Sequence, residues 1–582
     1  MNNMYESKFY PPDVGQDVLR SGQIIDINEM PHEMVDRVVQ TVAGVEVKFG
    51  TTEKDIIEFA QKLGRYIDDQ TIIFSTPVLT NAGRFNDRPL SACVVPPVDL
   101  RGDLSKVKEV VDEYHQDGMG TGFDLSDLSD PVSILNFLNS VAVDGAESGK
   151  EQRPVGNMAT LHVSHPKILE FVNVKVGADD RGERWKFNLS VNVSDKFMQA
   201  VVDNSEFILE DGTGIHAPTL FRQMAESCHA CGDPGIVFLD RMNAHNPTPF
   251  TGAYVSTAPC AEVGLAPGES CQFGYINLGN FIRYNEDKTS YIDLETLADV
   301  SATLLRALDN ALEISIDNYA TVQSQNIMTM KRKVGVGICG YADLLIKMGI
   351  PYNTPQAREI LLDLVNFINI NTKRESVELA KTRGAASAVR SVGSKYAQKN
   401  GYLAERYGNL ETQSVSSQEW IDLDEEIYRT GLLRNVTTIA LPPTGRSGMV
   451  IGASTGVEPL FKLSDRYGVN PVVIEILKQH SLDYVNIIEQ LYKEGKSVNV
   501  FDLPEEIRHI LVTATEINPI DHLMTVAEVQ KAVDESISKT VNLPADSTPD
   551  DIVKIQVLAY QLGLKGISVF RDNSRSYQPK EL

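Results

Sequence analysis

Residues 257–271 read TAPCAEVGLAPGESC, and the interpretation of the whole chain depends on this stretch. Two cysteines, Cys260 and Cys271, bracket a loop that contains glycine and proline, and Glu262 stands two residues after the first cysteine. A cysteine can serve as a nucleophile, a metal ligand or a one-electron radical carrier. A carboxylate two residues away on an extended loop can face the same pocket and do acid/base work. A buried cysteine beside a solvated glutamate is the alternative interpretation of these residues alone.

The composition sets the class of protein. The chain has 582 residues and 42% apolar residues, which is ample for a large core. The net charge of −25 and the lack of a basic tract argue against nucleic acid as a partner. No run of 18 apolar residues predicts a membrane span, and no signal peptide opens the chain. With only six cysteines, we expect a cytoplasmic protein whose disulfides turn over.

Short apolar runs alternate with longer amphipathic segments. Runs typical of buried strands or strand ends occur at 91–98, 235–243, 335–345 and 435–445. Apolar residues at three- and four-residue spacing predict helices over 294–316, 354–370 and 528–541. This alternation predicts an α/β fold with parallel strands.

A second stretch, LPPTGRSGMVIGASTGVEP at 441–459, is rich in glycine, serine and threonine and follows an apolar run. Such turns present backbone N–H groups and hydroxyls to phosphate, and Arg446 would add a bidentate donor. A purely structural turn explains the same residues. The glycine cluster GMGTGF at 118–123 lacks the full dinucleotide fingerprint, so it is a weak nucleotide signal.

The longer segment TAPCAEVGLAPGESCQFGYINLGNF at 257–281 resembles the active-site loop of class II ribonucleotide reductases, the adenosylcobalamin-dependent kind. Their pattern is Thr-Asn-Pro-Cys-Gly-Glu, followed by Glu-Ser-Cys-Asn-Leu-Gly. The resemblance runs from about residue 70 to residue 575. It is carried by ordered blocks that include FSTPVLTNAG, FNLSVNVSDKFMQAV, GDPGIVFLDRMNAHNP, KVGVGICGYADLLIKMGIPY, RNVTTIALPPTG, STGVEPLF, SISKTVNLP and GLKGISVFRDNSR.

The resemblance implies a ten-stranded α/β barrel made of two five-stranded parallel halves, with a central finger loop that carries the radical cysteine. It divides the chain into an N-terminal helical segment (1–70), a catalytic barrel (71–575) and a short tail without a cysteine pair (576–582).

The resemblance also assigns roles to residues. Cys260 matches the thiyl radical cysteine, and Glu262 matches the carboxylate that takes a proton from the 3′-hydroxyl of the substrate. Cys93 and Cys271 match the pair that supplies two electrons and ends as a disulfide. The positions that match substrate-binding residues are Thr76, Ser91, Ala258, Thr444, Gly445, Arg446 and Ser447. Adenosylcobalamin is the implied cofactor, and no protein-ligated metal is expected.

Residues near the end of the given sequence indicate which class of ribonucleotide reductase the chain resembles. Class I enzymes carry a tyrosine pair after a Gly-Leu-Lys segment, whereas GLKGISVF at 563–570 has no tyrosine. The final residues also lack the glycyl radical motif of class III. Class II remains, with a ribonucleoside di- or triphosphate as the expected substrate.

Three departures from the family pattern bear on function. Ala258 replaces an asparagine that is thought to bind the sugar, and Arg446 replaces a threonine in the phosphate turn. No cysteine follows Cys339, so a thioredoxin-like reductant or a separate tail-bearing subunit must re-reduce the pair. The N-terminus is too short for the ATP-binding cone, which leaves control by a deoxynucleoside triphosphate at a homodimer interface, with Asp99 as a candidate contact.

The expected function is therefore the radical reduction of ribonucleotides to 2′-deoxyribonucleotides. Two alternatives stay open. One is a radical enzyme that acts on a different nucleotide substrate or forms a different product, which Ala258 and Arg446 motivate. The other is a non-catalytic nucleotide-binding subunit.

Overall fold

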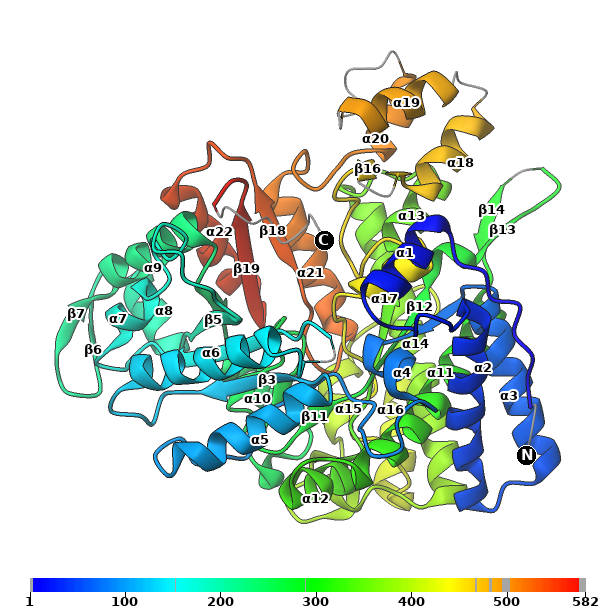
Figure 1. Ribbon diagram of the computed structural model, residues 1–582, viewed down its shortest axis with the longest axis horizontal. Coiled ribbons are helices and arrows are strands. Elements are labelled where there is room, and N and C mark those ends of the chain that lie inside the picture. Colours follow the sequence, from blue (N-terminus) through cyan, green and yellow to red (C-terminus); the bar gives the residue numbers. More distant parts are fainter. Residues whose placement is uncertain are drawn as a thin grey trace.

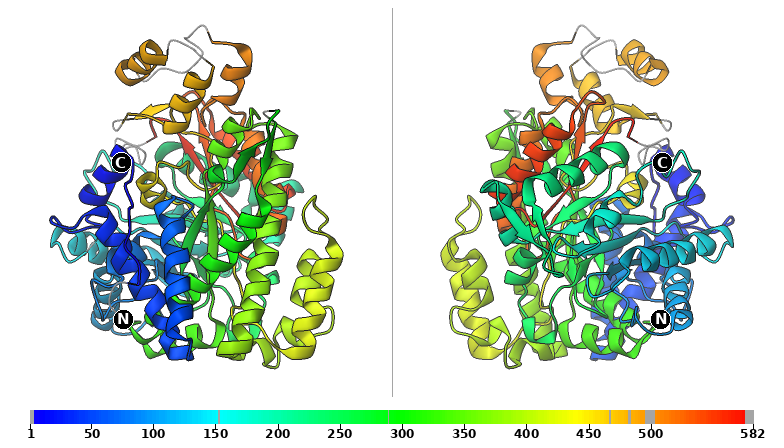
Figure 2. Two further views of the ribbon diagram at one scale, coloured as in Figure 1. Left: turned by 90° about the vertical axis from the view of Figure 1, so that its right-hand side faces the viewer. Right: turned by 90° about the vertical axis from the view of Figure 1, so that its left-hand side faces the viewer.

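An eight-stranded sheet runs through the molecule, and helices surround it (Figure 1 and Figure 2). The computed structural model describes residues 4–574, apart from residues 152, 288, 466–467, 481–483 and 495–502. The predicted tail at 576–582 lies outside the described residues. The mixture of helices and mainly parallel strands confirms the predicted α/β class.

The sheet has the order β11-β2-β3-β4-β5-β8-β19-β18. Five neighbouring strands run parallel: β2 (Cys93–Val94), β3 (Gly120–Asp124), β4 (Asn157–His162), β5 (Phe187–Asn192) and β8 (Gly235–Val237). At one edge, β11 (Ser270–Cys271) pairs antiparallel with β2. At the other, β19 (Gly566–Arg571) pairs antiparallel with β8 and parallel with β18 (Thr540–Leu543). The direction of the strands therefore changes between β8 and β19.

A second sheet continues from β11. Its central strand β12 (Phe273–Asn277) lies between β1 (Ile72–Phe74), which is antiparallel, and β15 (Gly335–Cys339), which is parallel. Isolated parallel bridges join Val336 to Ile439 and Leu441 to Ile537. The segment 439–441 thus links β15 to the chain that leads into β18. The strand predicted at 435–445 forms only these isolated bridges and is not a regular strand.

The helices cover both sheets (Figure 1). The N-terminal part contains α1 (Asp13–Ser21), α2 (Pro31–Gly44), the 3-10 helix η1 (Val45–Phe49), α3 (Glu53–Asp68) and α4 (Thr76–Asn81). Around the first sheet lie α5 (Leu104–Gln116), α6 (Pro131–Glu147), α7 (Ile168–Asn173), α8 (Asp195–Val202), α9 (Ala217–Cys231) and α10 (Leu239–Ala244). The remaining helices are α11 (Leu294–Asp317), α12 (Val322–Lys331), α13 (Tyr341–Lys347), α14 (Pro355–Arg383), α15 (Tyr402–Tyr407), α16 (Ser417–Thr430), α17 (Arg446–Val450), α18 (Pro471–Gln479), α19 (Tyr484–Glu494), α20 (Glu505–Ile510), α21 (Pro519–Val529) and α22 (Pro549–Gln561).

Short hairpins complete the structure: β6 (Glu206–Ile208) with β7 (Gly214–His216), β9 (Ser256–Thr257) with β10 (Gly264–Leu265), β13 (Ile282–Tyr284) with β14 (Ser290–Ile292), and β16 (Ser464–Asp465) with β17 (Gly468–Val469). The helices α18 to α20 stand apart from the main body, at the top of Figure 1. No helix in the described ranges is both long enough and apolar enough to cross a membrane.

Two of the three predicted helices are confirmed. The patterns at 294–316 and 354–370 fall on α11 and α14, and Thr354 caps α14 by accepting a hydrogen bond from the Ala357 N–H group. The predicted helix at 528–541 is wrong, because helical structure ends at Ala532 and the chain continues to β18. Its charged residues enter the interior instead: Asp534 pairs with Lys373, and Glu535 pairs with Lys333.

The first helix packs directly on α17 (Figure 1). A Cβ atom on Gly15 would lie only 2.1 Å from the Val450 carbonyl oxygen, so this approach requires glycine. The N-terminal segment thereby covers the helix that follows the predicted phosphate turn.

Candidate active site

The decisive loop of the sequence is a short hairpin. The strands β9 and β10 pair antiparallel, and residues 258–263 form the turn between them. Within the turn, the Ala258 N–H group donates to the Val263 carbonyl (3.1 Å) and the Ala261 N–H group donates to the Ala258 carbonyl (2.9 Å). Cys260 therefore lies at the tip. Ala261 has a φ of +60°, a left-handed conformation that costs a non-glycine residue about 1 kcal/mol.

Glycines in the first sheet make room for this hairpin. A Cβ atom on Gly122 of β3 would lie 2.4 Å from the Thr257 carbonyl oxygen. Cβ atoms on Gly120 and Gly156 would lie 3.1 and 3.3 Å from the ring of Pro259. The glycine cluster at 118–123 thus allows close backbone packing beneath the hairpin, which explains those glycines without a dinucleotide.

The Cys260 side chain is exposed, whereas the other three predicted catalytic residues are buried. Desolvation nonetheless raises the pKa of the Cys260 thiol well above its usual value, and the nearby charge of Glu262 raises it further. The thiol is thus accessible, although its surroundings disfavour the thiolate. At neutral pH the sulfur keeps its hydrogen.

Glu262 is buried, with 3% of its surface exposed, and its Oε2 atom has no hydrogen-bond partner. Burial raises the pKa of its carboxyl to about 7, and the backbone N–H groups of Glu262 and Cys260 oppose the shift only in part. A carboxyl with this pKa can accept or donate a proton near neutral pH.

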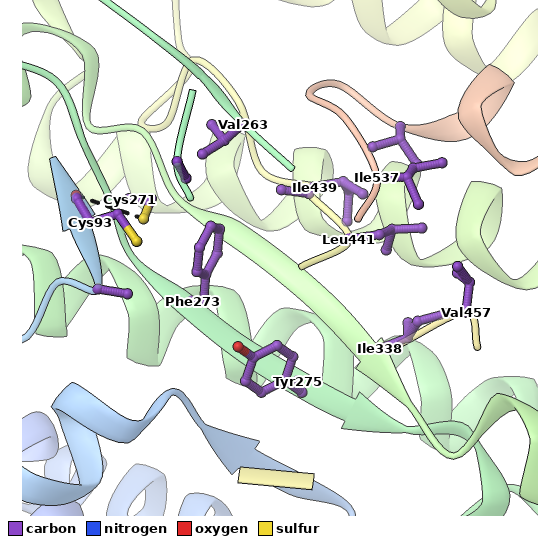
Figure 3. Packing of buried hydrophobic residues seen from close by; sticks show 14 of the residues in the cluster. Cys93, Val263, Cys271, Phe273, Tyr275, Ile338, Ile439, Leu441, Val457 and Ile537 are labelled. Atoms are coloured by element: carbon purple, nitrogen blue, oxygen red, sulfur yellow. Dashed lines mark hydrogen bonds between the residues drawn. The ribbon is translucent and has the colours of Figure 1, made fainter. Parts of the chain in front are cut away.

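Cys93 and Cys271 lie opposite each other on β2 and β11, although 178 residues separate them in the sequence (Figure 3). Directly opposed residues of an antiparallel pair have Cα atoms about 4.5–5.5 Å apart, which is within the range that a disulfide spans. The Cys271 thiol lies 3.7 Å from the Cys93 carbonyl oxygen. Hydrogen bonding with Cys271, followed by burial, raises the pKa of the Cys93 thiol well above its usual value. Both residues are present as thiols.

The predicted phosphate turn connects 439–441 to α17. Gly445 has a positive φ of 50°, and Thr444 is fixed by two bonds to the Thr455 hydroxyl, from its N–H group (3.0 Å) and from its own hydroxyl (2.9 Å). Thr76, at the start of α4, lies 3.5 Å from Ser447, measured between the two hydroxyl oxygens. The structure therefore places Thr76 beside the turn.

The remaining predicted binding residues have surroundings of their own. The Arg446 side chain runs beside Gly22, at the end of α1. The Ser91 hydroxyl is buried, donates to Gln272 (3.0 Å) and lies 2.6 Å from the Tyr319 hydroxyl. Ala258 is fully buried, and its methyl group provides no hydrogen bond. Asp99 is exposed, and its carboxylate accepts a hydrogen bond from the Arg101 N–H group.

Sequence reasoning missed Arg153. Its guanidinium group donates to the carbonyls of Gly118 (2.7 Å) and Ala92 (3.3 Å), which places it beside Cys93. Its positive charge lowers the pKa values of Cys93 and Cys260, against the larger effects that raise them. No motif surrounds Arg153 in the sequence, so only the folded arrangement reveals this position.

Comparisons with known proteins agree with the resemblance. A family model described as "Ribonucleotide reductase, barrel domain" matches residues 126–570. A protein of Mycobacterium tuberculosis (strain CDC 1551 / Oshkosh), named vitamin B12-dependent ribonucleoside-diphosphate reductase, is 31% identical over 94% of this chain and 77% of its own length. A protein of the same name from Thermoplasma acidophilum is 31% identical over 87% of this chain and 64% of its own length.

A solved structure gives the same fold. The class Id ribonucleotide reductase alpha subunit of Actinobacillus ureae superposes with a TM-score of 0.76 at 18% sequence identity, over 98% of each chain. With the family match covering most of the described residues, the chain belongs to the ribonucleotide reductase family.

Proposed function

We propose that this protein is a class II ribonucleotide reductase, which reduces ribonucleotides to 2′-deoxyribonucleotides by a thiyl radical that adenosylcobalamin generates. The observation that carries the proposal is the arrangement of Cys260 at the tip of a hairpin, beside Glu262 and within electrostatic range of Cys93, which lies directly opposite Cys271. The names of the Mycobacterium and Thermoplasma relatives, which are vitamin B12-dependent, support the choice of cofactor.

The residues fit this cofactor at the point of reaction. The Cys260 side chain is exposed, so a large group can approach its thiol from the accessible side. The cofactor, when bound, supplies the one-electron chemistry that converts the Cys260 thiol into a thiyl radical.

Cys260 and Glu262 each act twice in the proposed reaction, because the hydrogen atom and the proton that they take at the start return to the 3′ carbon and the 3′ oxygen at the end, which regenerates the Cys260 radical. The Cys260 radical takes the hydrogen atom from the 3′ carbon of the ribose, and the Glu262 carboxylate takes the proton of the 3′-hydroxyl. The 2′-hydroxyl leaves as water with a proton from the cysteine pair. Cys93 and Cys271 give up two hydrogens in all and become a disulfide, so one ribonucleotide and two thiols give one deoxyribonucleotide, one disulfide and one water. The raised pKa of Cys93 keeps its proton available for this step.

The substrate phosphates would lie on the turn formed by Thr444, Gly445, Arg446 and Ser447, with Thr76 beside it. The Ser91 hydroxyl, which is buried against Gln272 and Tyr319, would not reach them. Backbone N–H groups and hydroxyls of such turns suit a di- or triphosphate. The names of the relatives favour the diphosphate, because two of them are ribonucleoside-diphosphate reductases.

The proposed architecture is a ten-stranded barrel in two parallel halves. The first half is β2, β3, β4, β5 and β8. The second half is β12, β15, the segment 439–441, β18 and β19. The hairpin with Cys260 is the finger loop inside. On this division, residues 1–70 form the N-terminal helical segment and residues 71–575 the catalytic barrel.

The proposed partners follow from the same assignment. They are a deoxynucleoside triphosphate effector near Asp99 at a homodimer interface, and a thioredoxin-like reductant or a separate tail-bearing subunit in the cytoplasm. The exposed carboxylate of Asp99 is accessible to such an effector.

The direct test is anaerobic incubation of the protein with adenosylcobalamin, dithiothreitol and each ribonucleoside di- and triphosphate. We expect deoxynucleotide product. Cys260→Ser should reduce turnover by about 10³-fold or more, because the O–H bond of serine is too strong to be broken and no radical forms at residue 260. The variant should bind nucleotide like the unmodified protein. Absence of deoxynucleotide from every substrate would overturn the assignment, and nucleotide binding without turnover would favour a non-catalytic subunit.

One observation favours a second candidate, a radical enzyme of this family with a different product. Ala258 presents only a buried methyl group at the hairpin, so the sugar is held differently from the family pattern. Mass spectrometry of the products separates the candidates, because reduction replaces a hydroxyl by hydrogen and oxidises the dithiol, whereas an isomerisation does neither.

A further inference from the structure

Tyr275 points to the same interior face as the cysteine pair. Side chains alternate along an extended strand, so residues 271, 273 and 275 share one face. Figure 3 shows Cys271, Phe273 and Tyr275 in this order along the strand, with Cys93 opposite Cys271. Tyr275 therefore continues the row that begins with the dithiol.

The ring and the hydroxyl of Tyr275 have different surroundings. The ring packs over β15, where a Cβ atom on Gly337 would lie 3.0 Å from the ring Cδ1 atom. The hydroxyl donates a long hydrogen bond to the Pro443 carbonyl oxygen (3.4 Å), which is weak because O–H···O bonds are usually about 2.5–3.0 Å long. Only 4% of the residue is exposed. The single hydrogen of this buried hydroxyl is therefore held only weakly by Pro443, and a closer acceptor on a bound ligand can take its place.

This hydroxyl lies between the predicted phosphate turn and the cluster formed by Glu262 and the three cysteines. Pro443 directly precedes Thr444 of the phosphate turn, while Glu262, Cys271, Cys260 and Cys93 all act electrostatically on the phenol. Burial, and then these charges, raise the pKa of Tyr275 well above its usual value. The phenol is therefore neutral at physiological pH and can act as a hydrogen-bond donor.

A nucleotide that spans the cysteines and the phosphate turn must place its sugar between them. We propose that the Tyr275 hydroxyl donates a hydrogen bond to the sugar of the bound ribonucleotide, and that Tyr275 is a substrate-binding residue of this site; this inference rests on the proposed function. The contact would hold the ribose while the phosphates are held by the turn. It also supplies a polar group on the sugar side of the pocket, where Ala258 supplies none.

The test is the equilibrium affinity of the full-length protein and its Tyr275→Phe variant for CDP, CTP and inorganic pyrophosphate. The variant retains the ring and its packing on Gly337. Loss of one hydrogen bond to the sugar should weaken binding of CDP or CTP by about 3- to 10-fold. Pyrophosphate binding should change less than about 2-fold, because it uses only the phosphate turn. In turnover assays KM should rise by the same factor as the dissociation constant.

Tyr341→Phe is the matched control. Tyr341 is also buried, and its hydroxyl donates to the Ala357 carbonyl (2.8 Å), away from the site. This variant should bind nucleotide and pyrophosphate like the unmodified protein. Unchanged CDP and CTP affinity in Tyr275→Phe would overturn the inference, as would equal weakening of nucleotide and pyrophosphate, which would indicate displacement of Pro443 and the turn. Failure of the proposed function has a different signature, namely intact binding without deoxynucleotide product.

Discussion

Glu262 illustrates how burial alone changes what a side chain can do. Its Oε2 atom has no partner, no cation is paired with it among the described residues, and desolvation raises the pKa of its carboxyl to about 7. In an unfolded chain the same carboxyl titrates near 4.5. The folded protein therefore holds a proton on Glu262 over a pH range in which the unfolded chain has already lost it.

This difference makes a stability prediction with a definite sign. Below about pH 4.5 both states are protonated and Glu262 has no effect on stability. Between about pH 4.5 and pH 7 only the unfolded chain releases its proton, so the free energy of unfolding falls by up to about 3 kcal/mol and then stays level as the folded state also ionises. Glu262→Gln should therefore raise the melting temperature at pH 8 and have little effect at pH 4. Thermal unfolding at both values checks this. An equal shift at both pH values would show that the charge is not the cause.

At this scale the sequence identified the candidate residues but not their surroundings. Cys260 and Glu262 could be found because they are two residues apart in one recognisable motif. Arg153 and Tyr275 could not, because their positions depend on contacts with segments distant in the chain: Arg153 with Ala92, and Tyr275 with Pro443.

At the scale of elements, the hairpin with Cys260 is held by a buried ion pair beside it. The Lys333 ammonium group lies 2.9 Å from the Glu535 carboxylate and donates to the Gly264 carbonyl (2.8 Å). The next residue, Ser536, donates its N–H group to the Glu262 carbonyl (2.9 Å). The returning side of the hairpin is thus fixed at two points, by Lys333 and by the residue that follows its partner Glu535.

Replacing the lysine should loosen the hairpin. Lys333→Met leaves Glu535 without this cation and should cost about 3–5 kcal/mol. It should also increase the rate at which iodoacetamide alkylates Cys260, measured by peptide mass spectrometry well below the melting temperature. The physical reason is that the carbonyl of Gly264 loses its donor.

Lys175→Met is a suitable control, because Lys175 forms a comparably buried pair with Asp233 (2.5 Å) and its other hydrogen bond in the described part of the chain goes to the Phe187 carbonyl, not to the hairpin. It should lower stability without faster alkylation of Cys260. If both variants accelerate alkylation equally, general loosening of the fold is the explanation, and Lys333 has no special role.

Elements with a regular apolar period could be predicted from the sequence, and those defined by buried charge could not. The helices α11 and α14 have long apolar faces and a clear start at Thr354. The segment after Val529 has a helical pattern as well, but Asp534 and Glu535 are drawn to Lys373 and Lys333, and these tertiary ion pairs end the helix.

At the scale of the whole molecule, a second ionic network joins the N-terminal helices to the two longest helices of the chain. Glu46 of η1 accepts hydrogen bonds from Arg306 (2.8 Å) and Asn310 (2.9 Å) of α11 and from Arg383 of α14. Arg383 also bonds to Asp309 (2.9 Å). Burial alone would raise the pKa of Glu46, but the Arg306 bond and the Arg383 charge outweigh it and lower the pKa to about 2.

The lowered pKa predicts where acid weakens the molecule. Glu46 stabilises the fold above its unfolded pKa of about 4.5, and that contribution is lost as pH falls towards 2. Glu46→Gln should destabilise the protein by about 3 kcal/mol near pH 7 and by much less at pH 3, as measured by urea unfolding. Glu58→Gln, which removes an exposed pair with Lys54, should change stability by less than about 0.5 kcal/mol. A pH-independent cost for Glu46→Gln would contradict this account.

The class of fold was accessible from the sequence because strands and helices alternate, and because the blocks of the chain follow the order of a known family. The pairing of β2 with β11 was not, because these two strands lie far apart in the sequence and the other parallel strands of the first sheet come between them along the chain.

The pairing of Cys93 with Cys271 has a topological consequence. Oxidation of these two thiols would convert a linear chain into one that contains a covalent ring of about 180 residues, with most of the first sheet inside it. Each catalytic cycle of the proposed reaction would therefore close and reopen this ring. A protease cut within residues 94–270 would leave two fragments that separate in the reduced protein and stay joined in the oxidised one.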